Sequence, residues 1–209
     1  MKIIFCPRIG IDVKKHLYSL QKEVFRKSIH ICTAFVPLCL YFFRKQTLIF
    51  LFVAGLIYTL SEFLRIKGFN VPIIASITEA AARKRDQNRF VLGPVTLVAG
   101  CLLCAFLWDG MFASVGIYSL AFGDGLASLS GKLYGSVEIP FTGGKTAEGS
   151  LTCFTAIFIT SFLVLNNTAL SFIAALCGTL IEVLPLKDFD NICIPVVLGG
   201  VCQFLFPHI

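Results

Sequence analysis

Uncharged apolar segments recur along most of the chain and are separated by short polar or charged stretches. About 20 apolar residues are enough for a helix to cross the hydrocarbon core of a membrane. The uncharged runs cover residues 28–43, 46–61, 90–108, 110–131 with one internal acid, 149–181 and 191–209. Because the turn-like triplet Asn166-Asn167-Thr168 divides the fifth run, the pattern predicts about seven transmembrane helices, the first two short enough to tilt or to thin the bilayer locally.

The composition agrees with a membrane protein. The 209 residues are 56% hydrophobic and 14% charged, with a mean hydropathy of +0.84, whereas a soluble domain carries roughly 25% charged residues. We therefore predict an all-α, polytopic membrane bundle, with a basic segment over 1–27 and one membrane-embedded catalytic domain over 28–209. Residues 1–27 are basic and amphipathic without a small-residue cleavage site, so we do not expect a signal peptide there.

Basic residues fall mostly on one side of the predicted spans. Of the 18 Lys and Arg residues, seven precede residue 28, six lie within 65–89 and three lie in later loops, while only Arg44 and Lys45 fall on the other side. The positive-inside rule then places the N-terminus and these loops in the cytoplasm and the C-terminus outside. Within 71–85, apolar residues share one helical face, which predicts an interfacial helix on the cytoplasmic surface.

Acidic residues interrupt or border the predicted spans at their cytoplasmic ends. They are Glu62, Asp124, Glu148, Glu182 and Asp190. A carboxylate at membrane depth is costly, so its presence indicates a partner or a function. Carboxylates gathered beside basic loops are typical of a site for Mg²⁺ and polyphosphate. Alternatively, each acid pairs singly with a nearby basic side chain.

Asp124 stands between Gly123 and Gly125. Glycines allow a close approach of the backbone to a ligand and leave a neighbouring carboxylate unshielded. Small residues also recur at Ala127 and Gly131, a spacing typical of tight helix contact. Packing explains the glycines without explaining an acid between them, so the two interpretations are compatible.

The loop before residue 149 contains Gly143-Gly144-Lys145-Thr146. A Walker A loop needs a further glycine five positions before the glycine that precedes the lysine, and Ile139 occupies that position. This loop is therefore not a P-loop. Its glycine N–H groups at the start of a helix still predict an anion site. Lys145 could reach a phosphate, and Glu148, one helical turn on, could hold a metal.

Basic residues also precede the first predicted span. Arg26 and His30 share a helical face at a spacing of four, with Lys27 beside them. An Arg-Lys pair at this position is often only a topology anchor, so the pair alone does not define a site.

Together these segments resemble the CTP-dependent lipid kinase family, which includes dolichol kinase, phytol kinase and the yeast-type diacylglycerol kinase. The resemblance extends over about 25–195 and is carried by RKSIH, FGDGLASLSGKLYG, IPFTGGKTAEGSL and IEVLPLKDFDNICIP. It implies an integral membrane enzyme that transfers the terminal phosphate of a nucleoside triphosphate, commonly CTP, to the hydroxyl of an isoprenoid or glycerolipid. The large N-terminal membrane extension of dolichol kinases is not seen here, which leaves the acceptor lipid open.

Carried over residue by residue, the family motifs fall on Arg26-Lys27, Gly123-Asp124-Gly125, Lys145, Glu148 with Gly149, and Asp190, Asn191 with Pro195. From the residues and the resemblance we predict catalytic roles for Asp124, Glu148 and Asp190. We expect Mg²⁺ at Asp124, Glu148, Glu182 and Asp190. We expect the nucleotide at Arg26, Lys27, Gly123, Gly125, Lys132, Gly143, Gly144, Lys145 and Thr146.

Two other functions fit parts of the pattern. A cytidylyltransferase that makes a CDP-lipid would also need carboxylates for Mg²⁺ at a membrane interface, although its expected C-terminal acidic and arginine-containing signature is not found. A transporter would place acids through the whole depth of the bilayer, whereas these acids gather at one side. The expected partners are a lipid alcohol, a nucleoside triphosphate and membrane lipids, and not nucleic acid. The sequence does not decide CTP against ATP or UTP, or the oligomeric state.

Overall fold

The computed structural model describes residues 13–69, 78 and 89–208. These residues are mostly helical, and the described part contains one isolated β-bridge and no β-strand, which confirms an all-α fold. The interfacial helix predicted over 71–85 lies outside the described residues apart from Thr78, and so do the first twelve residues of the predicted basic segment.

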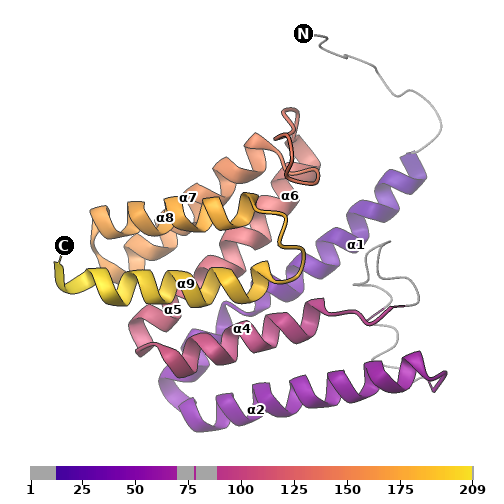
Figure 1. The fold of residues 1–209 in the computed structure, drawn as a ribbon, viewed down its shortest axis with the longest axis horizontal. Coiled ribbons are helices and arrows are strands. Elements are labelled where there is room, and N and C mark those ends of the chain that lie inside the picture. The colour runs from indigo at the N-terminus through magenta and orange to yellow at the C-terminus, as the bar shows by residue number, and fades with distance from the viewer. Residues whose placement is uncertain (1–12, 70–77, 79–88, 209) are drawn as a thin grey trace.

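The first part of the chain forms helices of different lengths that run back and forth through the bundle (Figure 1). They are α1 (Val13–Cys32), α2 (Phe35–Ile66), α4 (Gly93–Leu107), α5 (Gly110–Tyr118), the π-helical turn η2 (Ser119–Asp124) and α6 (Gly125–Tyr134). The last three follow one another without a break, so they form one continuous rod of 25 residues.

The second half adds three helices and a terminal turn: α7 (Ala147–Leu165), α8 (Thr168–Val183), α9 (Asp190–Leu205) and the 3₁₀ turn η3 (Phe206–His208). The break predicted at residues 166–168 is confirmed. Asn166 ends α7 in the left-handed conformation at φ 50°, and the Asn167 side chain accepts a hydrogen bond from Leu170 N at 3.0 Å. An asparagine tolerates this conformation and also caps a helix well, which explains the sharp turn.

The two predicted helices nearest the N-terminus have other boundaries. The expected spans over 28–43 and 46–61 are replaced by the end of α1, a turn at Thr33 and Ala34, and one helix of 32 residues. Arg44 and Lys45, expected in a loop, lie inside α2 next to a kink at Phe43. The Arg44 guanidinium donates to Ala105 O at 2.8 Å, so the charge is satisfied without ending the helix.

Within the described residues, four helical segments are long and apolar enough to cross a membrane. They are Phe35–Ile66, Gly110–Tyr134, Ala147–Leu165 and Asp190–His208, while Gly93–Leu107 and Thr168–Val183 are shorter apolar helices. The seven predicted spans are therefore not confirmed, but a multi-helix membrane bundle is supported. Of the 32 residues of α2, only Pro37, Ser61 and Glu62 are buried, which suits a helix that faces lipid.

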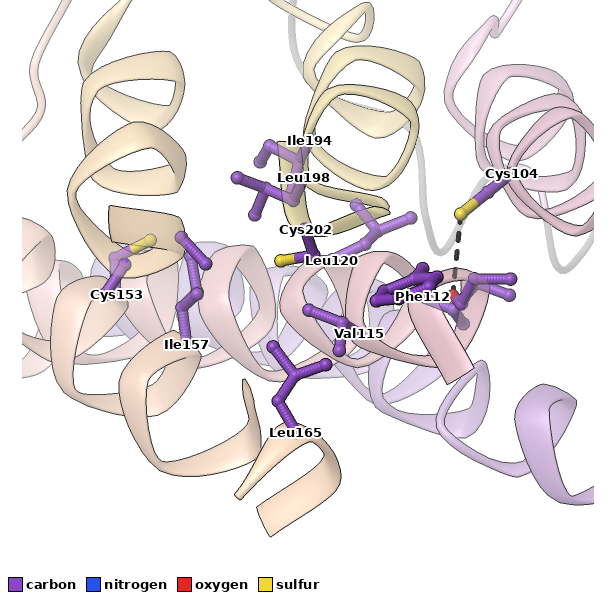
Figure 2. Close-up of a cluster of buried hydrophobic side chains, with 14 of the residues drawn as sticks. Cys104, Phe112, Val115, Leu120, Cys153, Ile157, Leu165, Ile194, Leu198 and Cys202 are labelled. Atoms are coloured by element: carbon purple, nitrogen blue, oxygen red, sulfur yellow. Dashed lines mark hydrogen bonds between the residues drawn. The ribbon is translucent and has the colours of Figure 1, made fainter. Parts of the chain in front are cut away.

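The core lies between α4, α5, α7, α8 and α9, and Figure 2 shows part of it. Val115, Ile157 and Leu198 are completely buried there. Small residues let the helices approach closely, since a Cβ on Gly116 would lie 2.7 Å from Cys104 Sγ. Cys104 itself donates to Pro195 O at 3.2 Å, so its thiol has a packing role.

Candidate active site

A buried ion pair joins α1 to the middle of the bundle. Lys27 Nζ donates to Asp124 Oδ2, and the two residues are only 1% and 5% exposed. His30, also on α1, places its Nδ1 3.2 Å from the same carboxylate oxygen. Lys27 is thus not a solvent-exposed topology anchor. The structure therefore brings together two of the residues predicted for the site, Lys27 and Asp124, which are 97 residues apart in the sequence.

The backbone around Asp124 is shaped by packing. Asp124 is the last residue of η2, and π-helical turns occur frequently at functional sites. A Cβ on Gly123 would lie 2.7 Å from Ile157 Cγ1 of α7, and one on Gly125 would lie 3.3 Å from Ile31 Cγ1 of α1. The two glycines therefore allow η2 and α6 to approach both neighbouring helices. Their predicted contact with nucleotide stays a prediction.

A second group of charges lies where α1 meets α6. Glu23 Oε1 accepts hydrogen bonds from Arg26 and from Ser128 Oγ, and Glu23 Oε2 lies 2.8 Å from Lys132 Nζ. Burial alone would raise the pKa of Glu23, but the two cations and the hydroxyl lower it to about 2. Glu23 is therefore an ionised carboxylate that holds two of the predicted phosphate-binding residues.

A third group joins α7 and α8. Lys145 Nζ lies 2.9 Å from Glu182 Oε1 and also donates to the backbone carbonyl of Glu182. Ser150 Oγ of α7 donates to Glu182 Oε2 at 3.3 Å. The thiol of Cys153, one turn further along α7, lies beside the residue that precedes Asp124, because a Cβ on Gly123 would lie 3.5 Å from Cys153 Sγ. The first and third ionic groups thus flank the same part of α7.

The Gly-Gly-Lys-Thr loop is the returning arm of a short hairpin before α7. Ile139 N donates to Lys145 O at 2.8 Å, and Gly143 and Gly144 have φ values of 76° and 99°. Glycine is favoured at such positive φ values because a side chain would clash. Thr146 Oγ1 accepts from Gly149 N at 3.2 Å and caps α7. The predicted role of this loop in nucleotide binding stays a prediction.

Two of the predicted catalytic acids make local hydrogen bonds. Glu148 Oε1 accepts from Ser136 N at 3.0 Å and from Ser136 Oγ, and it thereby fixes the start of the hairpin. Asp190 is buried at the start of α9, and its Oδ1 accepts from Asn191 N at 2.9 Å. The Asn191 amide donates to Thr96 Oγ1 at 2.9 Å and so ties α9 to α4.

The four predicted magnesium ligands are not gathered into one cage. Asp124, Glu148 and Glu182 each have different partners, and in the described ranges no three His, Cys, Asp or Glu residues come close enough to hold a metal ion. Magnesium in phosphoryl-transfer sites is often held by one or two carboxylates together with substrate phosphates. Both α1 contacts of Asp124 use its Oδ2, and its role in holding Mg²⁺ stays a prediction.

Sequence reasoning missed Glu23 as a site residue and noticed His30 only as a neighbour of Arg26. Glu23, Lys27 and His30 are spaced by four and three residues, which places them on one face of α1. That polar stripe, next to the first apolar run, was the available signal.

Glu62 is a different case: it is fully buried, Arg65 binds it through two nitrogens at 2.7 Å, and Val91 N donates to it at 2.8 Å. For Glu62, the alternative of a single pairing is correct.

The fold and these groups define a class: a helical bundle, with helices long and apolar enough to span a membrane, that buries a cation paired with a carboxylate. Its relatives are lipid kinases. The chain is 28% identical over 165 residues to the probable phytol kinase 1, chloroplastic, of Glycine max, covering 69% of this chain and 54% of the relative. It is 26% identical to the probable phytol kinase, chloroplastic, of Zea mays, covering 90% and 68%, and 28% identical to dolichol kinase sec59 of Schizosaccharomyces pombe, covering 86% and 39%.

The chain spans between about two fifths and two thirds of the length of the phytol and dolichol kinases that it matches. No protein-family model and no solved structure matches it. The chain is therefore a homologue of the phytol and dolichol kinases at 26–28% identity, and the resemblance carried by its motifs is confirmed.

Proposed function

We propose that this protein is a membrane lipid kinase that transfers the terminal phosphate of a nucleoside triphosphate, in the first place CTP, to the hydroxyl of a lipid alcohol. The names of its relatives point to alcohols such as phytol and dolichol. The observation that carries the proposal is the buried Lys27–Asp124 pair, because a membrane bundle that keeps such a costly pair in its interior needs a reason to do so.

Phosphoryl transfer requires little covalent chemistry from a protein, so its main tasks are positioning and neutralisation of charge. Arg26, Lys132 and Lys145 would bind the phosphates. The oxygen of the lipid hydroxyl attacks the terminal phosphorus, the bond from that phosphorus to the bridging oxygen breaks, and a nucleoside diphosphate leaves. Asp124 or Asp190 would accept the proton of the hydroxyl. The hydrocarbon chain of the alcohol would stay in the bilayer while its hydroxyl meets the nucleotide on the cytoplasmic side.

Magnesium would be held by Asp124 together with the nucleotide phosphates, with Glu148, Glu182 and Asp190 as further predicted ligands. When bound, the ion would neutralise negative charge on the phosphates. The side chains of the protein would then have to release some of their present partners, since Lys27 contacts Asp124 and Lys145 contacts Glu182.

The test is transfer of phosphate by purified protein in lipid-containing micelles. γ-Labelled CTP, ATP, UTP and GTP are each offered with phytol, geranylgeraniol, a long polyprenol or diacylglycerol. We expect a labelled lipid phosphate and release of a nucleoside diphosphate, with Asp124→Asn slower by about 10²-fold or more. Protein that binds nucleotide and transfers no phosphate to any acceptor would overturn the proposal. Release of pyrophosphate would indicate cytidylyl transfer instead.

A further inference from the structure

We propose that Glu23 is a positioning residue that holds Arg26 of α1 and Lys132 of α6 together as one binding unit for the phosphates of the nucleotide. The inference rests on the proposed function, because it assigns a role to Glu23 within that same site. The role of Glu23 is argued from its contacts alone.

The contacts place one carboxylate between two cations from different helices. Glu23 is 7% exposed, its Oε1 accepts from Arg26 and its Oε2 lies 2.8 Å from Lys132. Ser128 Oγ, one turn before Lys132 on α6, donates to Oε1 as well. Two like charges held in one place repel each other, so a carboxylate between them is needed to keep both in position. Without Glu23, the two helices would present these cations separately.

The contacts of Arg26 with Glu23 leave one of its donors unsatisfied. Arg26 Nε is buried and has no hydrogen-bond partner in the part of the chain that the structure describes. A buried donor without an acceptor costs free energy, and a phosphate oxygen is an acceptor that suits a guanidinium well. This unsatisfied donor favours an anion at the junction.

Glu62 provides a comparison with a purely structural carboxylate. Like Glu23, Glu62 is buried and pairs with an arginine three residues later in its helix. Arg65, however, binds both oxygens of Glu62 and also donates to Arg89 O at 2.9 Å, while Val91 N supplies a further donor. That pair is neutral and ties α2 to the chain before α4. Glu23 differs because it gathers a second cation from another helix.

The experiment compares Glu23→Gln with Glu62→Gln as a matched control. Both substitutions keep the size of the side chain and remove its charge from a buried pair with arginine. For each protein we measure the KM for CTP and for the lipid alcohol, kcat, the equilibrium binding of CTP, and unfolding in micelles. We expect Glu23→Gln to raise the KM and Kd for CTP by about tenfold or more, as loss of one charged hydrogen-bond network implies, and to leave the KM for lipid unchanged. Glu62→Gln should reduce stability without a change in the KM for CTP.

Unchanged CTP binding by Glu23→Gln would show that Glu23 is structural, and tighter binding would show that it competes with phosphate; either result overturns the inference. Wild-type protein that binds CTP but transfers no phosphate would overturn the proposed function alone, because the binding comparison still decides the role of Glu23. Equal effects of both substitutions on CTP binding would also count against it.

Discussion

Removal of Lys27 tests the buried ion pair most directly. Lys27→Met keeps a long unbranched side chain but leaves the Asp124 carboxylate, 5% exposed, with His30 as its remaining neighbour from α1. Removing one member of a buried ion pair typically destabilises a protein by about 3–5 kcal/mol, because the other charge stays buried without compensation. We therefore expect Lys27→Met to lower the free energy of unfolding by about that amount.

Removing both members gives a different result. Replacement of a buried pair by uncharged side chains of similar volume is often nearly neutral. The double variant with Lys27→Met and Asp124→Asn should then regain most of the stability lost by Lys27→Met, which gives a coupling energy of about 3 kcal/mol in a double-mutant cycle. The double variant should not regain activity. Each variant has lost a group of the site and should transfer phosphate about 10²-fold more slowly or worse.

The assay combines denaturant unfolding in detergent micelles with phosphate transfer by the same preparations, expressed per folded protein. The losses of unfolding free energy in the single variants Lys27→Met and Asp124→Asn are added and compared with the loss in the double variant. Agreement within about 0.5 kcal/mol would refute the ion pair, because independent sites behave in that way. A Lys27→Met variant with normal transfer would refute the assignment of this pair to the site, even if the coupling energy is as large as expected.

Three further predictions concern other parts of the bundle. Gly100→Ala should lower the free energy of unfolding by about 1–3 kcal/mol in micelles, because its Cβ would overlap the backbone carbonyl of Asn191. Lys145→Ala removes the charged partner of Glu182 and a predicted phosphate contact. It should weaken CTP binding, measured by calorimetric titration, about tenfold or more. Glu23 stabilises the fold above pH 4.5, and the difference in unfolding free energy between wild type and Glu23→Gln should shrink as the pH falls towards about 2.

The sequence predicts the helical class and several helix boundaries because these depend on local pattern. The asparagines at 166 and 167 end one helix and cap the next through their own conformation and side chains. The error over residues 28–61 has a physical reason. Arg and Lys are good helix formers, so the pair at 44 and 45 does not require a loop, and the carbonyl that satisfies Arg44 lies 61 residues away on α4.

The site could be predicted in its residue types but not in its pairings. The motifs name Lys27 and Asp124, yet nothing local shows that they touch across 97 residues of chain. Glu23 was missed because only one of its two cations, Arg26, is near it in the sequence. The other, Lys132, is 109 residues further on. Long-range ion pairs of this kind depend on which helices become neighbours, and hydrophobic periodicity alone does not determine that.

The pairings also explain how a lipid-facing bundle can keep so many charges inside. Lys27 is buried and contacts Asp124, and the partly buried Lys145 contacts Glu182, so these carboxylates reduce the cost of removing the two cations from water. A nucleoside triphosphate that arrives with Mg²⁺ would bring anions for the cations and a cation for the carboxylates. Under the proposed function, the same side chains would then change partners instead of losing them, and no four-carboxylate cage would be needed beforehand. Asp124 and Glu182 would thus also limit the affinity of the site for phosphate compounds that come without a metal ion.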